Sequence, residues 1–149
     1  MTSPETSPLP DSAKDMGLER ARTAARVAAE TRGTDLVVLD LRKLTPVFDY
    51  FVIATGTSRR QIHAMADEIE LVLKQQFGDV KRGGEGYEEG RWIVLDYGDT
   101  VVHLLDKEAR EFWDLEGLWN DARRVPLPES IPQLASIPQS DSSGPVGQA

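Results

Sequence analysis

The stretch WIVLDYGDTVVHLL, residues 92–105, predicts two short strands joined by a tight turn. The strands cover Trp92–Asp96 and Thr100–Leu105, and the connection is Tyr97-Gly98-Asp99. Gly98 is assigned a structural role in this turn, because glycine adopts turn conformations that other residues disfavour. The sequence therefore predicts an antiparallel hairpin in this part of the sheet.

A strand followed by a long helix precedes the hairpin. Residues 50–55 form an apolar strand, and Gly56-Thr57-Ser58 then opens a helix that ends at Gly78. Ser58, with a glutamine three residues later, matches a capping-box pattern. We therefore assign Ser58 to the helix cap and Gly56 to the turn before it.

The remaining elements are shorter or weaker. They comprise a helix over residues 15–32, a strand over 36–41, a weak strand near 80–82, a helix over 107–113 and a further turn through Trp119. The link of about eight residues between 36–41 and 50–55 is too short for a parallel crossover, so this pair should be antiparallel. The long helix leaves room for parallel pairing of 80–82 with 50–55. The expected fold is an α/β or α+β domain with a mixed sheet of four or five strands packed by helices.

The composition divides the chain into a folded centre and two tails. Residues 1–14 and 126–149 are rich in proline and serine, and we expect both to be disordered because they offer little apolar surface to bury. Residues 15–125 then form the domain. The chain has no cysteine, which excludes disulfides and thiol chemistry. It has neither a membrane-span pattern nor a targeting pattern, so a cytoplasmic location with no membrane partner is the expectation.

Charge is concentrated in residues 85–121. This segment holds 11 acidic and 3 basic residues, a net charge of −8 that equals the charge of the whole protein. It also contains all three tryptophans, which favours one or two exposed rings as anchors for a basic protein. The acidic balance argues against direct nucleic-acid binding beyond a small contact at a basic pair such as Arg59-Arg60.

Two segments offer an enzymatic alternative, a nucleotidyl- or phosphoryl-transfer reaction. Residues 55–60 lie between a strand and a helix, where backbone N–H groups attract phosphate, but they lack the spacing of a Walker A loop. Asp106 and Glu108 have the spacing of a metal-binding carboxylate pair, but Asp106 also suits a helix cap. The structural interpretation of both segments is favoured. No catalytic residue, metal ligand or cofactor is therefore assigned.

His63 and His103 lack a second ligand at zinc-site spacing. We interpret His103 as a packed or hydrogen-bonded residue, near the edge of a binding surface.

Three ordered motifs resemble the ribosomal silencing factor family, also called Iojap-like. Residues 49–58 are similar to its D-x-x-x-I-x-T-G-x-S segment. Glu85-Gly86, residues 92–98 and Val102-His103 are similar to E-G … W-[IV]-x-x-D-[YLF]-G … V-H. Arg110 and the stretch up to Trp119 are similar to R-x-x-[YW]-x-L-E-x-L-W.

The resemblance implies a core like that of nucleotidyltransferases, without their catalytic carboxylate pair. It implies a translational repressor that binds the large ribosomal subunit through large-subunit ribosomal protein fourteen. Bound there, it blocks joining of the small subunit, especially under nutrient limitation. A homodimer is left open. The residues expected at or beside the partner are Trp92, Asp96, His103, Trp113, Leu115 and Glu116, with Glu85 and Trp119 as further candidates.

Overall fold

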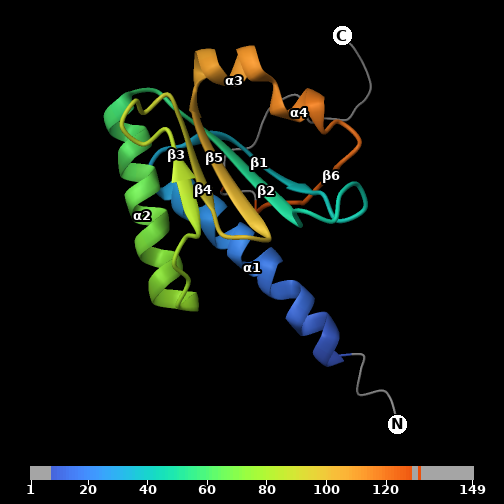
Figure 1. Ribbon diagram of the computed structural model, residues 1–149. Helices are drawn as coiled ribbons and strands as arrows, with labels where there is room; N and C mark the ends of the chain where they lie inside the picture. The colour runs from blue at the N-terminus through green and yellow to red at the C-terminus, as the bar shows by residue number, and fades with distance from the viewer. Residues whose placement is uncertain (1–7, 129–130, 132–149) are drawn as a thin grey trace.

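The computed structural model describes residues 8–128 and 131, which form a mixed sheet covered by helices (Figure 1). The elements in chain order are α1 (Pro8–Glu30), β1 (Thr34–Asp40), β2 (Tyr50–Gly56), α2 (Arg59–Phe77), β3 (Gly83–Glu85), β4 (Trp92–Asp96), β5 (Thr100–Asp106), α3 (Lys107–Trp113), α4 (Leu115–Leu118) and β6 (Arg123–Arg124). The strand order across the sheet is β3-β4-β5-β2-β1-β6. This is the predicted α+β class, with six strands rather than four or five.

Only the central pair of strands is parallel. Tyr50 of β2 lies opposite Thr100 of β5 and the register continues without interruption to Gly56 and Asp106, whereas every other pair in the sheet is antiparallel. The predicted antiparallel pairing of β1 with β2 is confirmed. The parallel pairing considered for residues 80–82 is wrong, because the neighbouring strand β3 pairs with β4 and β5 takes the place beside β2.

Helices α1 and α2 cover one face of the sheet, and α3 and α4 lie away from them, at the top of the view in Figure 1. The covered face buries alternate strand residues such as Val52, Leu95 and Leu104 against α1 and α2. Burial of these apolar side chains is the main source of the fold's stability. The opposite face has its own, smaller apolar cluster, which α3 and α4 cover only in part.

The predicted boundaries of α2 are confirmed by its caps. Ser58 Oγ accepts the backbone N–H of Gln61 at 3.1 Å. The Gln61 side chain accepts the backbone N–H of Thr57 rather than that of Ser58, so only half of the capping-box pattern forms. Gly78 ends the helix with φ of 71°, a left-handed conformation that glycine adopts without strain.

The two glycines assigned to turns have different physical roles. Gly98 has φ of +94° in the β4–β5 hairpin, which confirms its assignment. Gly56 is buried at the end of β2, where a Cβ atom would lie 2.6 Å from Ile62 Cγ1. Close packing of β2 against α2, rather than turn geometry, therefore requires glycine at position 56.

Both ends of the folded region differ from the prediction. Helix α1 begins at Pro8 rather than at residue 15, so residues 8–14 are helical and not a disordered tail. Proline is compatible with a first helical position because its missing N–H would have no partner there. At the other end, Leu127 and Ile131 are buried in the core beyond the expected boundary at residue 125. The rest of the two expected tails lies outside the described residues.

Candidate partner-binding surface

The sheet face opposite α1 and α2 carries a continuous series of aromatic rings. Neighbouring rings in the series have centroids between 4.5 and 6.0 Å apart. We call this series the aromatic cluster, which consists of Phe48, Phe51, Trp119, His103, Trp92, Trp113 and Phe112.

Strand register explains why these residues meet. His103 in β5 lies opposite Val94 on one side and Ile53 on the other. Trp92 lies two residues before Val94 and Phe51 two residues before Ile53, so both are diagonal neighbours of His103 on the same face. Because Phe51 and His103 are far apart in sequence, only the parallel pairing of β2 with β5 brings them together.

Within the cluster, His103 is a buried member that binds the Trp92 indole. The indole N–H of Trp92 donates to His103 Nδ1 at 3.1 Å, and the imidazole edge meets the Phe51 ring at 4.5 Å between centroids. Burial lowers the pKa of His103 to about 4, because a charged imidazole would lose its hydration. His103 is therefore neutral near pH 7, with its lone pair on Nδ1. This confirms the interpretation of His103 as a packed, hydrogen-bonded residue.

Burial decreases along the cluster from the sheet toward α3. Phe51 is 6% exposed, Trp92 is half-buried, Trp113 is 54% exposed and Phe112 is 76% exposed. An exposed pair of large rings is costly in water and is typical of a contact surface. The outer end of the cluster is thus the part available to a partner.

A buried ion pair fixes α3 and α4 beside the cluster. Arg110 Nε donates to Glu116 Oε2 at 2.9 Å, and its Nη1 donates to Thr55 Oγ1 at 2.7 Å. A third bond reaches the backbone carbonyl of Asp35 at 2.8 Å. Leu115, only 8% exposed, packs into the apolar cluster below. Arg110 is therefore a structural cation that joins both short helices to the sheet.

Carboxylates surround the exposed rings. A groove of about 640 Å³ separates α3 from the β3–β4 connection, and its walls include Glu85, Glu89, Trp92, Glu108, Phe112 and Trp113. Arg91 pairs with Glu108 and, at 3.3 Å, with Asp106, so this cation is already engaged. Glu85 and Glu89 are exposed on the opposite wall. The surface therefore combines apolar rings with a negatively charged rim.

The eight predicted partner-binding residues fall into three groups. Trp113 and Glu85 are exposed, and Trp92 and Trp119 are half-buried within or beside the same surface. His103, Leu115 and Glu116 lie beneath it and support it. Asp96 is at the far end of β4, where its carboxylate accepts the Gly98 N–H at 2.8 Å and so stabilises the hairpin turn.

Phe112 is a surface residue that the sequence reasoning missed. It is 76% exposed and contacts the Trp113 ring edge-on at 5.0 Å between centroids. A signal was available, because two adjacent aromatic residues on a helix point about 100° apart and cannot both be buried against one sheet. Leu118 on α4 is likewise exposed, at 71%.

The residues of the enzymatic alternative are occupied by structural contacts. Asp106 caps α3 by accepting the Ala109 N–H at 2.7 Å, and Thr55 is bound by Arg110. Within residues 8–128 and 131, no three His, Asp or Glu side chains approach closely enough to hold a metal ion. In the same part of the chain, no helix is both long and apolar enough to cross a bilayer. The contacts of Asp106 and Thr55 favour the structural interpretation of residues 55–60 and of the Asp106/Glu108 pair.

Comparison with known proteins agrees with the motif resemblance. The family model described as ribosomal silencing factor during starvation matches residues 14–146. The chain belongs to the ribosomal silencing factor family. Ribosomal silencing factor RsfS of Chromobacterium violaceum is 38% identical over 101 residues, which cover 68% of this chain and 82% of the relative. Its Bacillus subtilis counterpart is 39% identical over 101 residues, covering 68% and 85%.

Solved structures show the same fold. An X-ray structure of a Chromobacterium violaceum protein has a TM-score of 0.67 and 34% identity, and the match covers 83% of this chain and 98% of that one. A Bacillus halodurans crystal structure has a TM-score of 0.65 and 33% identity over 74% of this chain. This chain therefore shares the fold of those two structures.

Proposed function

We propose that this protein represses translation by docking on the large ribosomal subunit and blocking the approach of the small subunit. The contact is made to large-subunit ribosomal protein fourteen, chiefly under nutrient limitation, in the cytoplasm. The observation that carries the proposal is an exposed aromatic surface with a negatively charged rim in a member of the silencing-factor family.

The chemistry of the surface suits a basic protein rather than RNA. Trp113 and Phe112 supply large apolar area at low entropic cost, which is the usual composition of an interface centre. Glu85 and Glu89 supply charge complementary to a basic partner, whereas Glu108 is already paired with Arg91. The same carboxylates repel the phosphates of neighbouring RNA, which restricts docking to a protein patch.

The mechanism is occlusion and requires no catalytic group. Repression needs an affinity that competes with subunit association, on the order of nanomolar to micromolar Kd. His103, Leu115 and Glu116 contribute indirectly because they fix the rings and α4 from below. Trp92, Trp113, Glu85 and Trp119 contribute directly.

Sedimentation tests the proposal. Wild-type protein should co-migrate with isolated large subunits and lower the yield of joined ribosomes when small subunits are added. Trp113→Ala and Phe112→Ala should each cost about 2 kcal/mol of binding free energy, or about thirtyfold in Kd, because they remove interface anchors. Both side chains are exposed, so the variants should fold normally.

The matched control is Val80→Ala. Val80 is 70% exposed but lies beyond the end of α2, beside Asp79 and away from the aromatic cluster. It should bind like the wild type. Failure of the wild-type protein to co-migrate, or equal loss in all three variants, would contradict the proposed docking surface.

A further inference from the structure

Side chains on one side of α2 form hydrogen bonds with the connection between β3 and β4. Arg59, His63 and Asp67 follow one another at four-residue intervals, which places them along one side of the helix. The Arg59 guanidinium donates to the carbonyl of Glu88, and His63 Nε2–H donates to the carbonyl of Tyr87. The Tyr87 hydroxyl donates to Asp67 at 2.9 Å.

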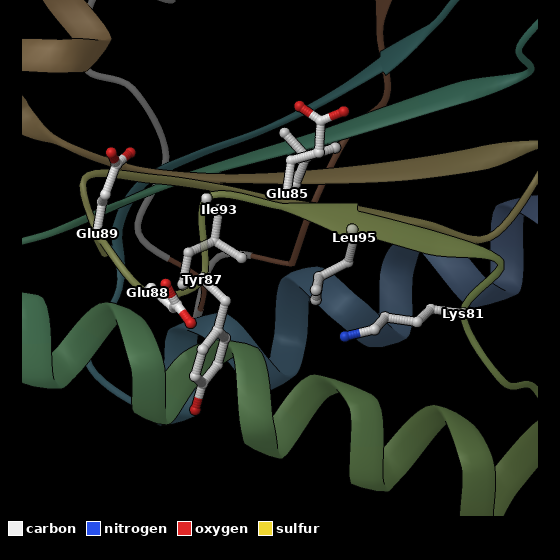
Figure 2. A pocket seen from close by; sticks show the side chains of 10 residues that line it. Lys81, Glu85, Tyr87, Glu88, Glu89, Ile93 and Leu95 are labelled. Atoms are coloured by element: carbon white, nitrogen blue, oxygen red, sulfur yellow. The ribbon is translucent and has the colours of Figure 1, made fainter.

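A ring contact and the close packing of a glycine also hold the β3–β4 connection against α2. The His63 and Tyr87 rings lie 4.3 Å apart between centroids, and Figure 2 shows the Tyr87 ring extending over α2. Gly90 is buried with φ of +69°, and a Cβ atom there would lie 2.5 Å from Arg59 Cγ. The hydrogen bond to the Asp67 carboxylate also raises the pKa of Tyr87, because the bond favours the protonated phenol.

The same connection forms a wall of the candidate surface. We call residues 85–90 the acidic loop, because they carry Glu85, Glu88 and Glu89. Glu85 and Glu89 line the groove beside Trp113. In Figure 2, Glu85 points to the side of β3 opposite the Tyr87 ring. The loop thus faces α2 with Tyr87 and the aromatic surface with carboxylates.

We propose that Arg59, His63 and Asp67 are positioning residues, which hold the acidic loop in the conformation that a basic partner recognises. The inference rests on the proposed function. It adds that α2, which does not form the docking surface, controls the affinity of that surface for the partner. Residues 86–90 of this loop, beyond the end of β3, would lose conformational entropy on docking if they were free, whereas a loop held in place beforehand does not.

Two neighbouring arginines give a matched test. Arg59 and Arg60 are both exposed in the first turn of α2, but they project about 100° apart and only Arg59 is bonded to the loop. Arg59→Ala and Arg60→Ala remove the same charge. Binding of each variant to isolated large subunits is measured by interferometry, and amide hydrogen exchange is measured over residues 85–90.

Arg59→Ala should weaken binding about three- to tenfold and speed exchange in the acidic loop, with an unchanged melting temperature. Arg60→Ala should do neither, and Arg59→Lys should restore binding because lysine can still donate to the Glu88 carbonyl. Tyr87→Phe is a second variant that keeps the ring contact with His63 and removes only the hydroxyl bond to Asp67. It should show a smaller change in the same direction.

The outcomes separate this inference from the proposed function. Equal binding by Arg59→Ala and Arg60→Ala, or faster loop exchange with unchanged affinity, overturns the positioning role while wild-type docking stands. Absence of wild-type binding overturns the proposed function and the inference built on it. Faster loop exchange with weaker binding in Arg59→Ala alone supports both.

Discussion

His103 contributes to the surface by its position rather than by proton chemistry. Its Nδ1 accepts the Trp92 indole N–H, and its Nε2 is buried without a hydrogen-bond partner among the described residues. A buried N–H donor without a partner lowers the free energy of unfolding, so His103 Nε2 reduces the stability of the protein. The indole bond keeps the Trp92 ring in one orientation, and burial keeps the imidazole neutral.

The buried imidazole predicts a specific pH dependence of stability. The folded pKa of His103, about 4, lies below the ordinary value near 6.5, so the unfolded chain takes up the proton first as pH falls. The free energy of unfolding should therefore decrease between about pH 6.5 and 4. The total loss from this group is about 3 kcal/mol.

Urea unfolding of the wild type and His103→Gln at pH 7, 5.5 and 4.5 measures this effect. The wild type should lose more stability than the variant over that range, since carboxylate titration is common to both. Parallel pH profiles would show that His103 titrates normally and is accessible to water in the folded state.

At the scale of elements, local signals predicted α2, α3 and the hairpin correctly, whereas α1 begins earlier than predicted. The stripe of apolar residues in α2 and the glycine after it fixed its length, because capping and periodicity act within one turn. The hairpin of β4 and β5 likewise depends on residues close in sequence. One or two of the three tryptophans were expected to be exposed, and among them Trp113 is exposed while Trp92 and Trp119 are half-buried.

Elements that depend on distant partners were not predictable in this way. β3 contains Gly83-Gly84, which has low strand propensity, and β6 is two arginines whose only strand signal is the neighbouring β1. The aromatic cluster required the parallel register of β2 and β5, which the sequence left open. The positions of Leu115 and Glu116 depend on α4 packing against the sheet and on the bond from Arg110, which local sequence does not reveal.

The packed segment after β6 gives a test at the scale of elements. Ile131 is 6% exposed and belongs to the core on the α1 side of the sheet. Ile131→Ala should lower the free energy of unfolding by about 2 kcal/mol, because it removes buried methylene groups and leaves a cavity. Chemical denaturation measures the change, with the exposed Val47→Ala as control. If the free energy of unfolding changed by less than about 0.5 kcal/mol, residue 131 would not be packed in the core, in agreement with the predicted disordered tail.

At the scale of the whole molecule, the two faces of the sheet have separate roles. Helices α1 and α2 bury one face and provide most of the core, while the other face exposes rings and carboxylates between α3 and the acidic loop. An ion pair between Arg20 and Asp99, at 3.0 Å, joins α1 to the hairpin on the covered side. We therefore expect mutations on the proposed docking side to alter binding without unfolding the protein.

Site-specific photocrosslinking tests the docking orientation most directly. A benzoylphenylalanine placed at position 112, in the exposed end of the aromatic cluster, should crosslink to large-subunit ribosomal protein fourteen in a mixture with large subunits. The same group at position 80, beyond the C-terminal end of α2, should not crosslink to that protein. Crosslinking from position 80 but not from position 112 would contradict the account, because the opposite side of the molecule would then face the ribosome.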